Sequence, residues 1–338
     1  MNSNSNIVLK VTNLQTKFHV GKRIVHAVND VSFELKYGTT LGIVGESGCG
    51  KSVTAHSIMQ LLPKAGYIAN GVVRYYDKSG KERILSSFGR NSKEIRAIRG
   101  KVIAMIFQDP SSSLDPVYCI GSQIAENLFQ HEKLSKKEGK LRVVNILMEL
   151  GIPTPEKRYN DYPHQFSGGM KQRVMIATAM ICNPDILIAD EPTTALDVTI
   201  QAQILTLMKE LQKNYGTSII LITHNMGIIA ETCDEVAVMY MGRIVEFGSL
   251  EQIFNSPLHP YTKALLKSVP VLGVGKRAEL ESIRGITPDA SIVFAGCEFE
   301  PRCDYACEKC KQFPPYDQTI KDNHHVRCWL YAGGNEDG

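Results

Sequence analysis

Residues 166–173 read FSGGMKQR, and this glycine-rich segment is the most informative part of the chain. Ser167, Gly168 and Gly169 stand at the start of a stretch with helical character that runs to Met180. A hydroxyl group and unobstructed backbone N–H groups at the start of a helix form a site for an anion. The sequence therefore predicts a phosphate-binding segment here, followed by a helix.

A second phosphate-binding segment lies much earlier in the chain. Residues 45–52 read GESGCGKS and fit the P-loop pattern G-x-x-x-x-G-K-[ST]. The apolar run 40–44 predicts a buried strand before it, and residues 51–62 predict a helix after it. In a P-loop the lysine reaches the β- and γ-phosphates and the last hydroxyl is a Mg²⁺ ligand. The residues expected to contact the nucleotide are Gly45, Ser47, Gly48, Cys49, Gly50, Lys51, Ser52 and Val53. Two phosphate segments for one triphosphate suggest that one of them serves a different molecule.

Acidic residues that suit the same nucleotide follow another apolar run. Residues 186–190 read ILIAD, and Glu191 comes next. The apolar residues predict a buried strand, and Asp190 then stands at its carboxyl end, where α/β sheets bind ligands. Asp190 is therefore predicted to hold Mg²⁺ through water. Glu191 is placed to polarise the attacking water as a general base.

Two polar residues that follow predicted strands complete the expected catalytic set. Gln108 follows the run 101–107 and, having both a donor and an acceptor, can contact water, Mg²⁺ and the γ-phosphate. His224 follows the run 218–223 and can donate to the γ-phosphate. Each of these residues alone is weak evidence, because a lone Gln at a strand end is usually just solvated.

Composition limits the class of protein. The chain has 338 residues and a net charge of +3, with basic residues spread along its length. This small charge argues against a dedicated nucleic-acid surface. No apolar run approaches the roughly 18 to 20 residues that a spanning helix needs. The first ten residues, MNSNSNIVLK, lack the pattern of a signal peptide, which predicts a cytoplasmic location.

Strands that alternate with helices predict an α/β domain with a mostly parallel sheet. The predicted nucleotide-binding domain covers residues 1–255, with an inserted helical subdomain at about 109–180. Composition shifts near residue 256, and a short helix, a Pro- and Gly-containing linker and a cysteine-rich tail follow. Residues 256–338 are therefore expected to form a C-terminal extension.

The order of these motifs over about residues 9–248 resembles that of ATP-binding cassette (ABC) ATPases. The resemblance implies an α/β P-loop NTPase cassette, with a RecA-like core, an antiparallel β subdomain and an inserted helical subdomain. In that family two cassettes pack head to tail with ATP between them. Carried over, the segment Ser167, Gly168, Gly169 and Met170 contacts ATP held by a partner cassette, and Asp197 lies near the subunit boundary. Phe18 matches the aromatic residue that stacks on adenine, although a core phenylalanine is the alternative.

A finer resemblance extends to nearly the whole chain. The stretches GIVGESGCGKS (42–52), FQDPSSSLDP (107–116), SPLHPYTKAL (256–265), GCEFEPRC (296–303) and HVRC (325–328) are similar to those of dipeptide and oligopeptide importer ATPases. This similarity implies a subunit that hydrolyses ATP to power peptide import at the cytoplasmic face of a bacterial or archaeal membrane. The implied partners are a second ATPase subunit (a related chain or another copy), two membrane permease subunits and an extracytoplasmic peptide-binding protein. No nucleic-acid partner is expected.

The tail holds a cysteine series with the spacing C-x5-C-x6-C-x17-C, formed by Cys297, Cys303, Cys310 and Cys328. The resemblance implies that these four thiolates bind a 4Fe–4S cluster. Zn²⁺ also accepts four cysteines, and reduced packing thiols are a third possibility. Cys307 is additional to the family pattern. We expect a cluster that pins the tail structurally, with zinc as the alternative.

Other functions stay open at the level of sequence. An importer for nickel or another small solute belongs to the same subfamily. Cassettes of DNA repair or chromosome structure carry long coiled coils or zinc modules within the cassette, whereas only about 115 residues separate Lys51 from Ser167 here. Cassette-type translation factors usually have two cassettes in one chain, and this sequence shows the motifs of one. The presence of both Glu191 and His224 argues against a non-catalytic regulator, which would not require them. Peptide import is the predicted function.

Overall fold

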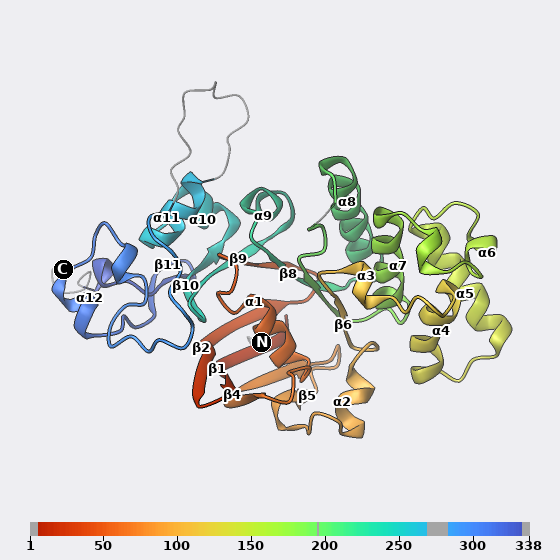
Figure 1. Cartoon of the computed structure of the whole chain (residues 1–338), viewed down its shortest axis with the longest axis horizontal. Helices are drawn as coiled ribbons and strands as arrows, with labels where there is room; N and C mark the ends of the chain where they lie inside the picture. The colour runs from red at the N-terminus through yellow and green to blue at the C-terminus, as the bar shows by residue number, and fades with distance from the viewer. Residues whose placement is uncertain (1–5, 195, 269–282, 333–338) are drawn as a thin grey trace. The chain divides into compact units, whose positions relative to one another are not determined.

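The computed structural model describes residues 6–194, 196–268 and 283–332 (Figure 1). The linker predicted after the short helix falls on 269–282 and lies outside the described residues. No helix among the described residues is both long enough and apolar enough to cross a bilayer.

The chain forms two compact units, and each is assembled from segments that are far apart in the sequence. Of the described residues, the first unit, called here the helical unit, contains 6–8, 36–39, 88–194 and 196–222. The second, called the P-loop unit, contains 9–35, 40–87, 223–268 and 283–332. Each unit is described by itself.

An antiparallel sheet in the P-loop unit is built from the N-terminal third of the chain. Its strand order is β2-β1-β4-β5 (Figure 1). The strands are β1 (Ile7–Val20), β2 (Arg23–Lys36), β4 (Gly66–Tyr76) and β5 (Glu82–Ile84). The turn between β4 and β5 is held by the Asp77 carboxylate, which accepts from the N–H groups of Ser79 and Lys81, each at 3.0 Å. An Asp side chain that bonds the backbone two residues on favours such turns, and β4 and β5 form an antiparallel hairpin around residues 77–80.

A second sheet of the P-loop unit contains the strand that leads into the P-loop. Strand β3 (Thr40–Val44) pairs in parallel with β9 (Glu235–Tyr240), and β10 (Arg243–Ser249) pairs antiparallel with β9. The C-terminal tail adds β12 (His324–Val326) beside β10 and β11 (Gln318–Lys321) beside β12. All of β3 is buried, as expected for a strand covered on both faces.

Short helices complete the P-loop unit. They are α1 (Lys51–Ile58), α9 (Met226–Thr232), α10 (Leu250–Asn255), α11 (Pro260–Lys267) and α12 (Glu308–Gln312). Single turns of 3₁₀ helix lie at η1 (Leu85–Ser87), η3 (Glu300–Arg302) and η4 (Trp329–Tyr331). Helix α1 ends four residues before the predicted position 62, because Gln60 adopts a left-handed conformation with φ of 54°.

Three parallel strands form the core of the helical unit. Their order is β6-β7-β8, from β6 (Ile103–Ile106), β7 (Ile186–Asp190) and β8 (Ser218–Thr223). Every residue of these strands is buried, which explains their continuous apolar sequences. The parallel sheet predicted from the strand and helix alternation is therefore present in this unit.

Helices make up the rest of the helical unit (Figure 1). They are α2 (Lys93–Ile98), α3 (Pro110–Ser113), α4 (Ile120–His131), α5 (Lys136–Glu149), α6 (Pro155–Arg158), α7 (Gly168–Met180) and α8 (Val198–Tyr215), with a 3₁₀ turn η2 (Pro163–Gln165). Helices α4 and α5 are separate, because Ser135 begins α5 with a capping box to Glu138. Helices α4 and α5 contact each other and α7.

Candidate nucleotide site

The P-loop joins β3 to α1 within the P-loop unit, as the sequence predicts. Gly48 and Gly50 have φ angles of 79° and 103°, which L-residues with side chains rarely adopt. Ser47 and Gly48 are exposed, whereas Cys49 and Gly50 are buried. The loop therefore presents its middle to solvent and anchors its C-terminal part in the protein.

Lys51 begins α1 and is buried, with 5% of its surface exposed. Its Nζ donates to the carbonyl oxygens of Gly45 at 2.8 Å and Glu46 at 3.0 Å. These bonds hold the ammonium group across the loop to which it belongs. An amine in this position can exchange carbonyl oxygens for phosphate oxygens when a nucleotide binds. Ser52 and Val53, the next predicted contacts, lie half-buried in the first turn of α1.

Cys49 is a packing residue of the loop. Its side chain is 1% exposed, and burial raises the pKa of its thiol. A Cβ added to Gly45 would lie 2.9 Å from the Cys49 Sγ and 2.1 Å from the Met239 oxygen in β9. The sulfur therefore fills the space under the loop. Cys49 can contact a phosphate only through its backbone N–H group.

The helical unit brings two predicted catalytic residues into direct contact. Asp190 ends β7 with 4% of its surface exposed, and Glu191 follows with a positive φ of 48°. The Glu191 Oε2 accepts from the Gln108 Nε2 at 3.0 Å and from the Thr194 Oγ1 at 2.9 Å. Thr194 is a functional candidate that sequence reasoning missed, and its place three residues after the acid in EPTT was the available signal.

The segment 166–173 forms a helix start, as predicted. Ser167 is the N-cap of α7, and its Oγ accepts from the Met170 N–H at 3.4 Å. Ser167 and Gly168 are exposed, and Gly169 faces Ile200, whose Cγ2 would be 2.9 Å from an added Cβ. The exposed hydroxyl and N–H groups suit an anion that arrives from outside the unit.

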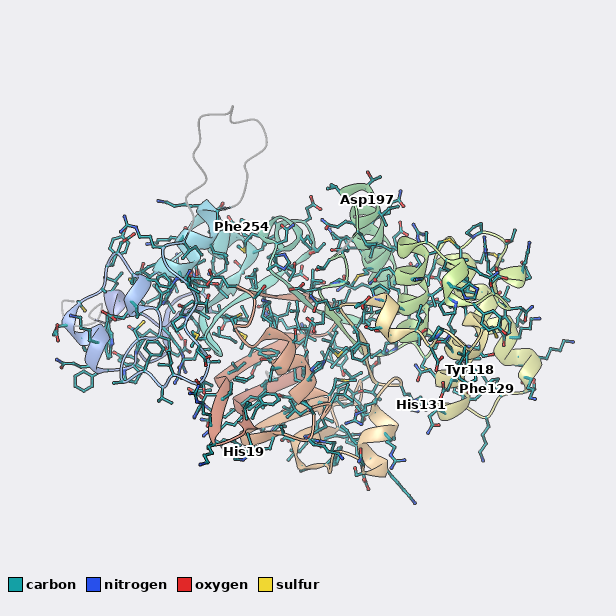
Figure 2. All side chains as sticks on the ribbon, in the orientation of Figure 1. His19, Tyr118, Phe129, His131, Asp197 and Phe254 are labelled. Carbon is teal, nitrogen blue, oxygen red and sulfur yellow. The ribbon has the colours of Figure 1, made fainter. Side chains whose placement is uncertain are left out.

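Asp197 caps the neighbouring helix (Figure 2). It stands at the start of α8 with an exposed side chain, and its Oδ1 accepts from the Ile200 N–H at 2.9 Å. The helix-cap role is thus present in the structure. Its predicted position near a subunit boundary stays a prediction.

His224 and Phe18 belong to the P-loop unit. His224 follows β8 and is exposed next to Asn225, the N-cap of α9. The half-buried Phe18 pairs with Gly66 across β1 and β4, and its ring covers that glycine, because an added Cβ would lie 2.5 Å from the Phe18 Cε1. Neither placement tests the predicted contacts with phosphate and adenine.

Comparison with known proteins identifies the family. The family model described as ABC transporter matches residues 28–194, and the one described as Oligopeptide/dipeptide transporter, C-terminal region, matches residues 245–310. The Dipeptide transport ATP-binding protein DppD of Bacillus subtilis is 49% identical over 324 residues, which cover 96% of this chain and 94% of the relative. The chain belongs to the ATP-binding proteins of the oligopeptide/dipeptide ABC transporters.

Further comparisons agree with this membership. The Oligopeptide transport ATP-binding protein OppD of Bacillus subtilis is 50% identical, with 96% of this chain and 88% of that protein covered. A solved dimeric, post-hydrolysis structure of the ATP-binding cassette MJ0796, bound to ADP and Pi, matches with a TM-score of 0.62 and 27% identity, covering 72% of this chain and 98% of that one. The predicted ABC cassette fold is thereby confirmed, and the chain is an ABC-type ATPase that uses ATP and Mg²⁺.

The iron–sulfur prediction for the tail is wrong. Among the described residues, no three His, Cys, Asp or Glu side chains are grouped so that they could hold a metal ion. One expected ligand, Cys310, has a thiol neighbour, and this neighbour is the additional Cys307, whose sulfur lies 3.5 Å away. Burial raises the pKa of the Cys297 thiol to about 12 and that of the Cys328 thiol to about 11.

The arrangement of the tail explains this correction. Metal ligation needs several ligand atoms within bonding distance of one point. The five tail cysteines line one cavity of about 60 Å³ together with Phe299 and Trp329, but no three of these described side chains are close enough to one another to hold an ion. As placed, they form no site for a 4Fe–4S cluster or a zinc ion, and neither Cys303 nor Cys310 joins a ligand group.

Proposed function

We propose that this chain is the ATP-hydrolysing subunit that powers import of dipeptides or oligopeptides through a membrane ABC permease. The hydrogen bond of 3.0 Å between Gln108 and Glu191, at the carboxyl end of β7, carries the proposal. It joins the residue proposed as general base to the residue proposed to respond to the γ-phosphate. The relatives named for dipeptide and oligopeptide transport support the choice of peptide as cargo.

Each part of the chain has a proposed task in ATP hydrolysis. The P-loop holds the phosphates through its backbone N–H groups and Lys51. Ser52, Gln108 and Asp190 supply oxygen atoms, which suit Mg²⁺, and the bound ion would neutralise phosphate charge. Glu191 takes a proton from the attacking water, and His224 orients the γ-phosphate. Phe18 stacks on the adenine ring.

The remaining contacts are proposed to come from other subunits. Ser167, Gly168, Gly169 and Met170 would bind the ATP of a second cassette, a related chain or another copy. The segment after Gln108 would contact a permease, and it carries the exposed side chains of Val117 (70%) and Tyr118 (59%). Tyr118 is labelled in Figure 2. Two permease subunits and an extracytoplasmic peptide-binding protein complete the proposed complex, at the cytoplasmic face of the membrane. We also retain residues 1–255 and 256–338 as the proposed nucleotide-binding domain and extension.

Replacement of the proposed base tests this function. Glu191→Gln keeps the size and the hydrogen bonds of the side chain but cannot accept the proton. We expect MgATP binding close to wild type and a turnover that is about 10²-fold to 10⁴-fold lower. Glu149→Gln, which removes a carboxylate bonded to the Tyr215 hydroxyl in the same unit, serves as the matched control and should leave turnover unchanged.

Cargo is tested separately in the assembled transporter. Vesicles that contain the complex should accumulate a labelled dipeptide or oligopeptide with wild-type chain and not with Glu191→Gln. Normal hydrolysis by Glu191→Gln would show that the general base is another residue. ATP-dependent uptake of Ni²⁺ without uptake of peptide would replace the proposed cargo.

A further inference from the structure

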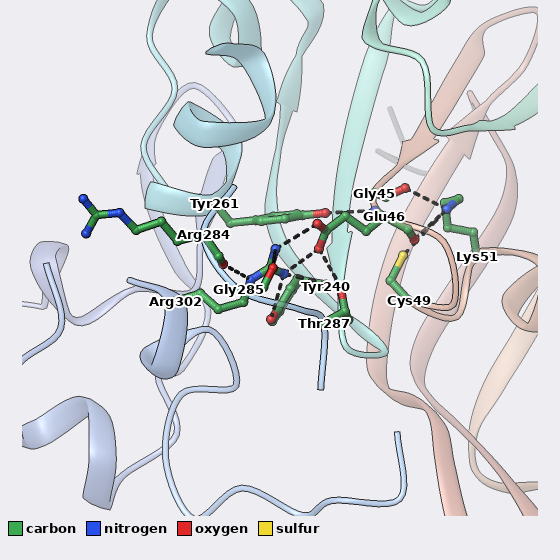
Figure 3. A network of polar contacts seen from close by, with 10 residues as sticks. All are labelled: Gly45, Glu46, Cys49, Lys51, Tyr240, Tyr261, Arg284, Gly285, Thr287 and Arg302. Carbon is green, nitrogen blue, oxygen red and sulfur yellow. Dashed lines mark hydrogen bonds and ion pairs between the residues drawn. The ribbon is translucent and has the colours of Figure 1, made fainter. Parts of the chain in front are cut away.

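A buried arginine of the C-terminal tail contacts the second residue of the P-loop (Figure 3). Arg302 lies in η3, within the GCEFEPRC stretch, and only 4% of its side chain is exposed. Its Nη1 donates to the Glu46 Oε2 at 2.6 Å, and its Nη2 donates to Oε1 at 2.9 Å. This is a bidentate pair, the geometry in which a guanidinium binds a carboxylate most specifically.

The other donors of Arg302 are also used within the P-loop unit. Its Nε donates to the Arg284 oxygen at 2.7 Å, and Nη1 lies 3.4 Å from the hydroxyl groups of both Thr287 and Tyr240. The guanidinium also stands over the Tyr240 ring, 5.7 Å from its centre. These contacts fix the orientation of the fork, because a planar guanidinium with all its donors engaged cannot rotate freely.

Glu46 is the single residue that links Arg302 to Lys51. Its carboxylate accepts from Arg302 and from the Thr287 Oγ1, its N–H donates to the Tyr261 hydroxyl at 2.9 Å, and its carbonyl accepts from the Lys51 Nζ at 3.0 Å. Burial raises the pKa of Glu46, but the hydrogen bonds from Arg302 and Thr287 and nearby positive charge outweigh it, so the pKa is lowered overall. Glu46 is therefore ionised and held from three directions.

We propose that Arg302 is a positioning residue of the nucleotide site, through which residues 283–303 set the affinity for ATP. Because Arg302 fixes Glu46, the first peptide groups of the P-loop keep one conformation before phosphate binds. The Lys51 ammonium group, which is bonded to these peptide groups, is held with them. A loop that is already ordered loses less conformational entropy when it binds its ligand. This inference rests on the proposed role of Lys51 in phosphate binding.

The test measures equilibrium binding of MgATP to the full-length chain. Arg302→Gln should raise the Kd between about threefold and about thirtyfold, the usual range for residues that act through another. Arg302→Lys keeps the charge without the fork and should give a smaller rise. Glu46→Gln should match Arg302→Gln, and the double variant should be no worse than either single one, because both remove the same interaction.

A matched control separates positioning from general weakening of the tail. Arg243 forms an ion pair with Glu298, which also ties the tail to the sheet. Among the described residues, the hydrogen bonds of these two side chains do not include a P-loop residue. Arg243→Gln should leave the Kd within about twofold of wild type. In wild type, ATP should also slow amide hydrogen exchange in residues 300–303, since coupling between two sites is reciprocal, and this protection should disappear in Glu46→Gln.

The outcomes are distinct. A folded Arg302→Gln or Arg302→Lys that binds ATP as wild type does, or an equal loss in Arg243→Gln, overturns the positioning role. If the Arg302 variants do not fold, Glu46→Gln decides in the same way. Full ATP affinity in Lys51→Ala would instead show that the proposed phosphate site is wrong, whatever Arg302 does.

Discussion

The two glycine-rich segments of this chain solve the problem of phosphate binding differently. The P-loop has glycines with positive φ angles, a buried lysine and side chains from several elements that hold Glu46. The segment 166–173 has none of the positive φ angles, and its glycines continue an ordinary helix with an exposed serine cap. A phosphate site formed by a loop with unusual φ angles needs contacts from other elements to hold the loop. A phosphate site at the start of a helix needs only the N-cap residue of that helix.

The largest difference is expected when alanine replaces a glycine in each segment. An added Cβ at Gly50, where φ is 103°, would lie 2.3 Å from the Ala27 oxygen. Gly50→Ala should therefore lower the free energy of unfolding by about 4 kcal/mol. At Gly168 the nearest atom would be 3.9 Å away, and Gly168→Ala should raise stability by up to about 0.5 kcal/mol, because alanine favours helix. Urea unfolding of both variants checks the opposite signs, and equal losses would erase the contrast.

The second comparison replaces the polar side chain of each segment and measures nucleotide affinity. Lys51→Ala should raise the Kd for MgATP by about 100-fold, since it removes charge-assisted bonds to phosphate. Ser167→Ala should leave the affinity of the isolated chain unchanged, because its proposed ATP belongs to another cassette. Titration with a fluorescent ATP analogue measures both values. Weaker ATP binding by the isolated Ser167→Ala chain would contradict this division of roles.

The third prediction uses pH to test the support of the P-loop. His259 is the N-cap of α11, where its Nδ1 accepts from the N–H of Tyr261, the residue that holds Glu46. Burial and then Lys263 lower the pKa of His259 from 6.5 to about 3, so the native state keeps the ring neutral. The unfolded chain takes up a proton below 6.5, and stability should fall by about 2 kcal/mol between pH 7 and pH 5.

His259→Asn provides the control for this pH effect, since asparagine still caps the helix but does not titrate. The slope of unfolding free energy against pH should flatten in this variant between pH 5 and pH 7. An unchanged slope would assign the effect to other groups.

The smallest effect is expected at the support of the 166–173 segment. Asp197→Ala removes the cap of α8 and loosens Ile200 against Gly169. It should cost about 1 kcal/mol of stability, and Asp197→Asn, which keeps a cap, should cost less. Thermal unfolding measures both. A cost of several kcal/mol would mean that this segment depends on tertiary support as much as the P-loop does.

Much of the fold and of the nucleotide site could be predicted from the sequence. Strands that are buried on both faces read as continuous apolar runs, so the positions of β3, β7 and β8 were visible. Polar residues that follow such runs stand at strand ends, which explains why Gln108 and Glu191 were expected near one another. Helix length was less predictable, because α1 ends where Gln60 adopts a left-handed conformation that no local pattern in the sequence marks.

By itself, the sequence determined the chemistry that depends on neighbouring residues: a glycine loop before Lys51, an acid pair after β7 and a serine cap before α7. Only the tertiary structure decided which distant residues meet. Arg302 and Glu46 are 256 positions apart, and nothing in either local pattern marks them as partners. The same holds for the tail cysteines, whose spacing suggested a metal site that their placement does not form. Local patterns record backbone geometry, whereas contacts across the chain depend on how the whole backbone packs.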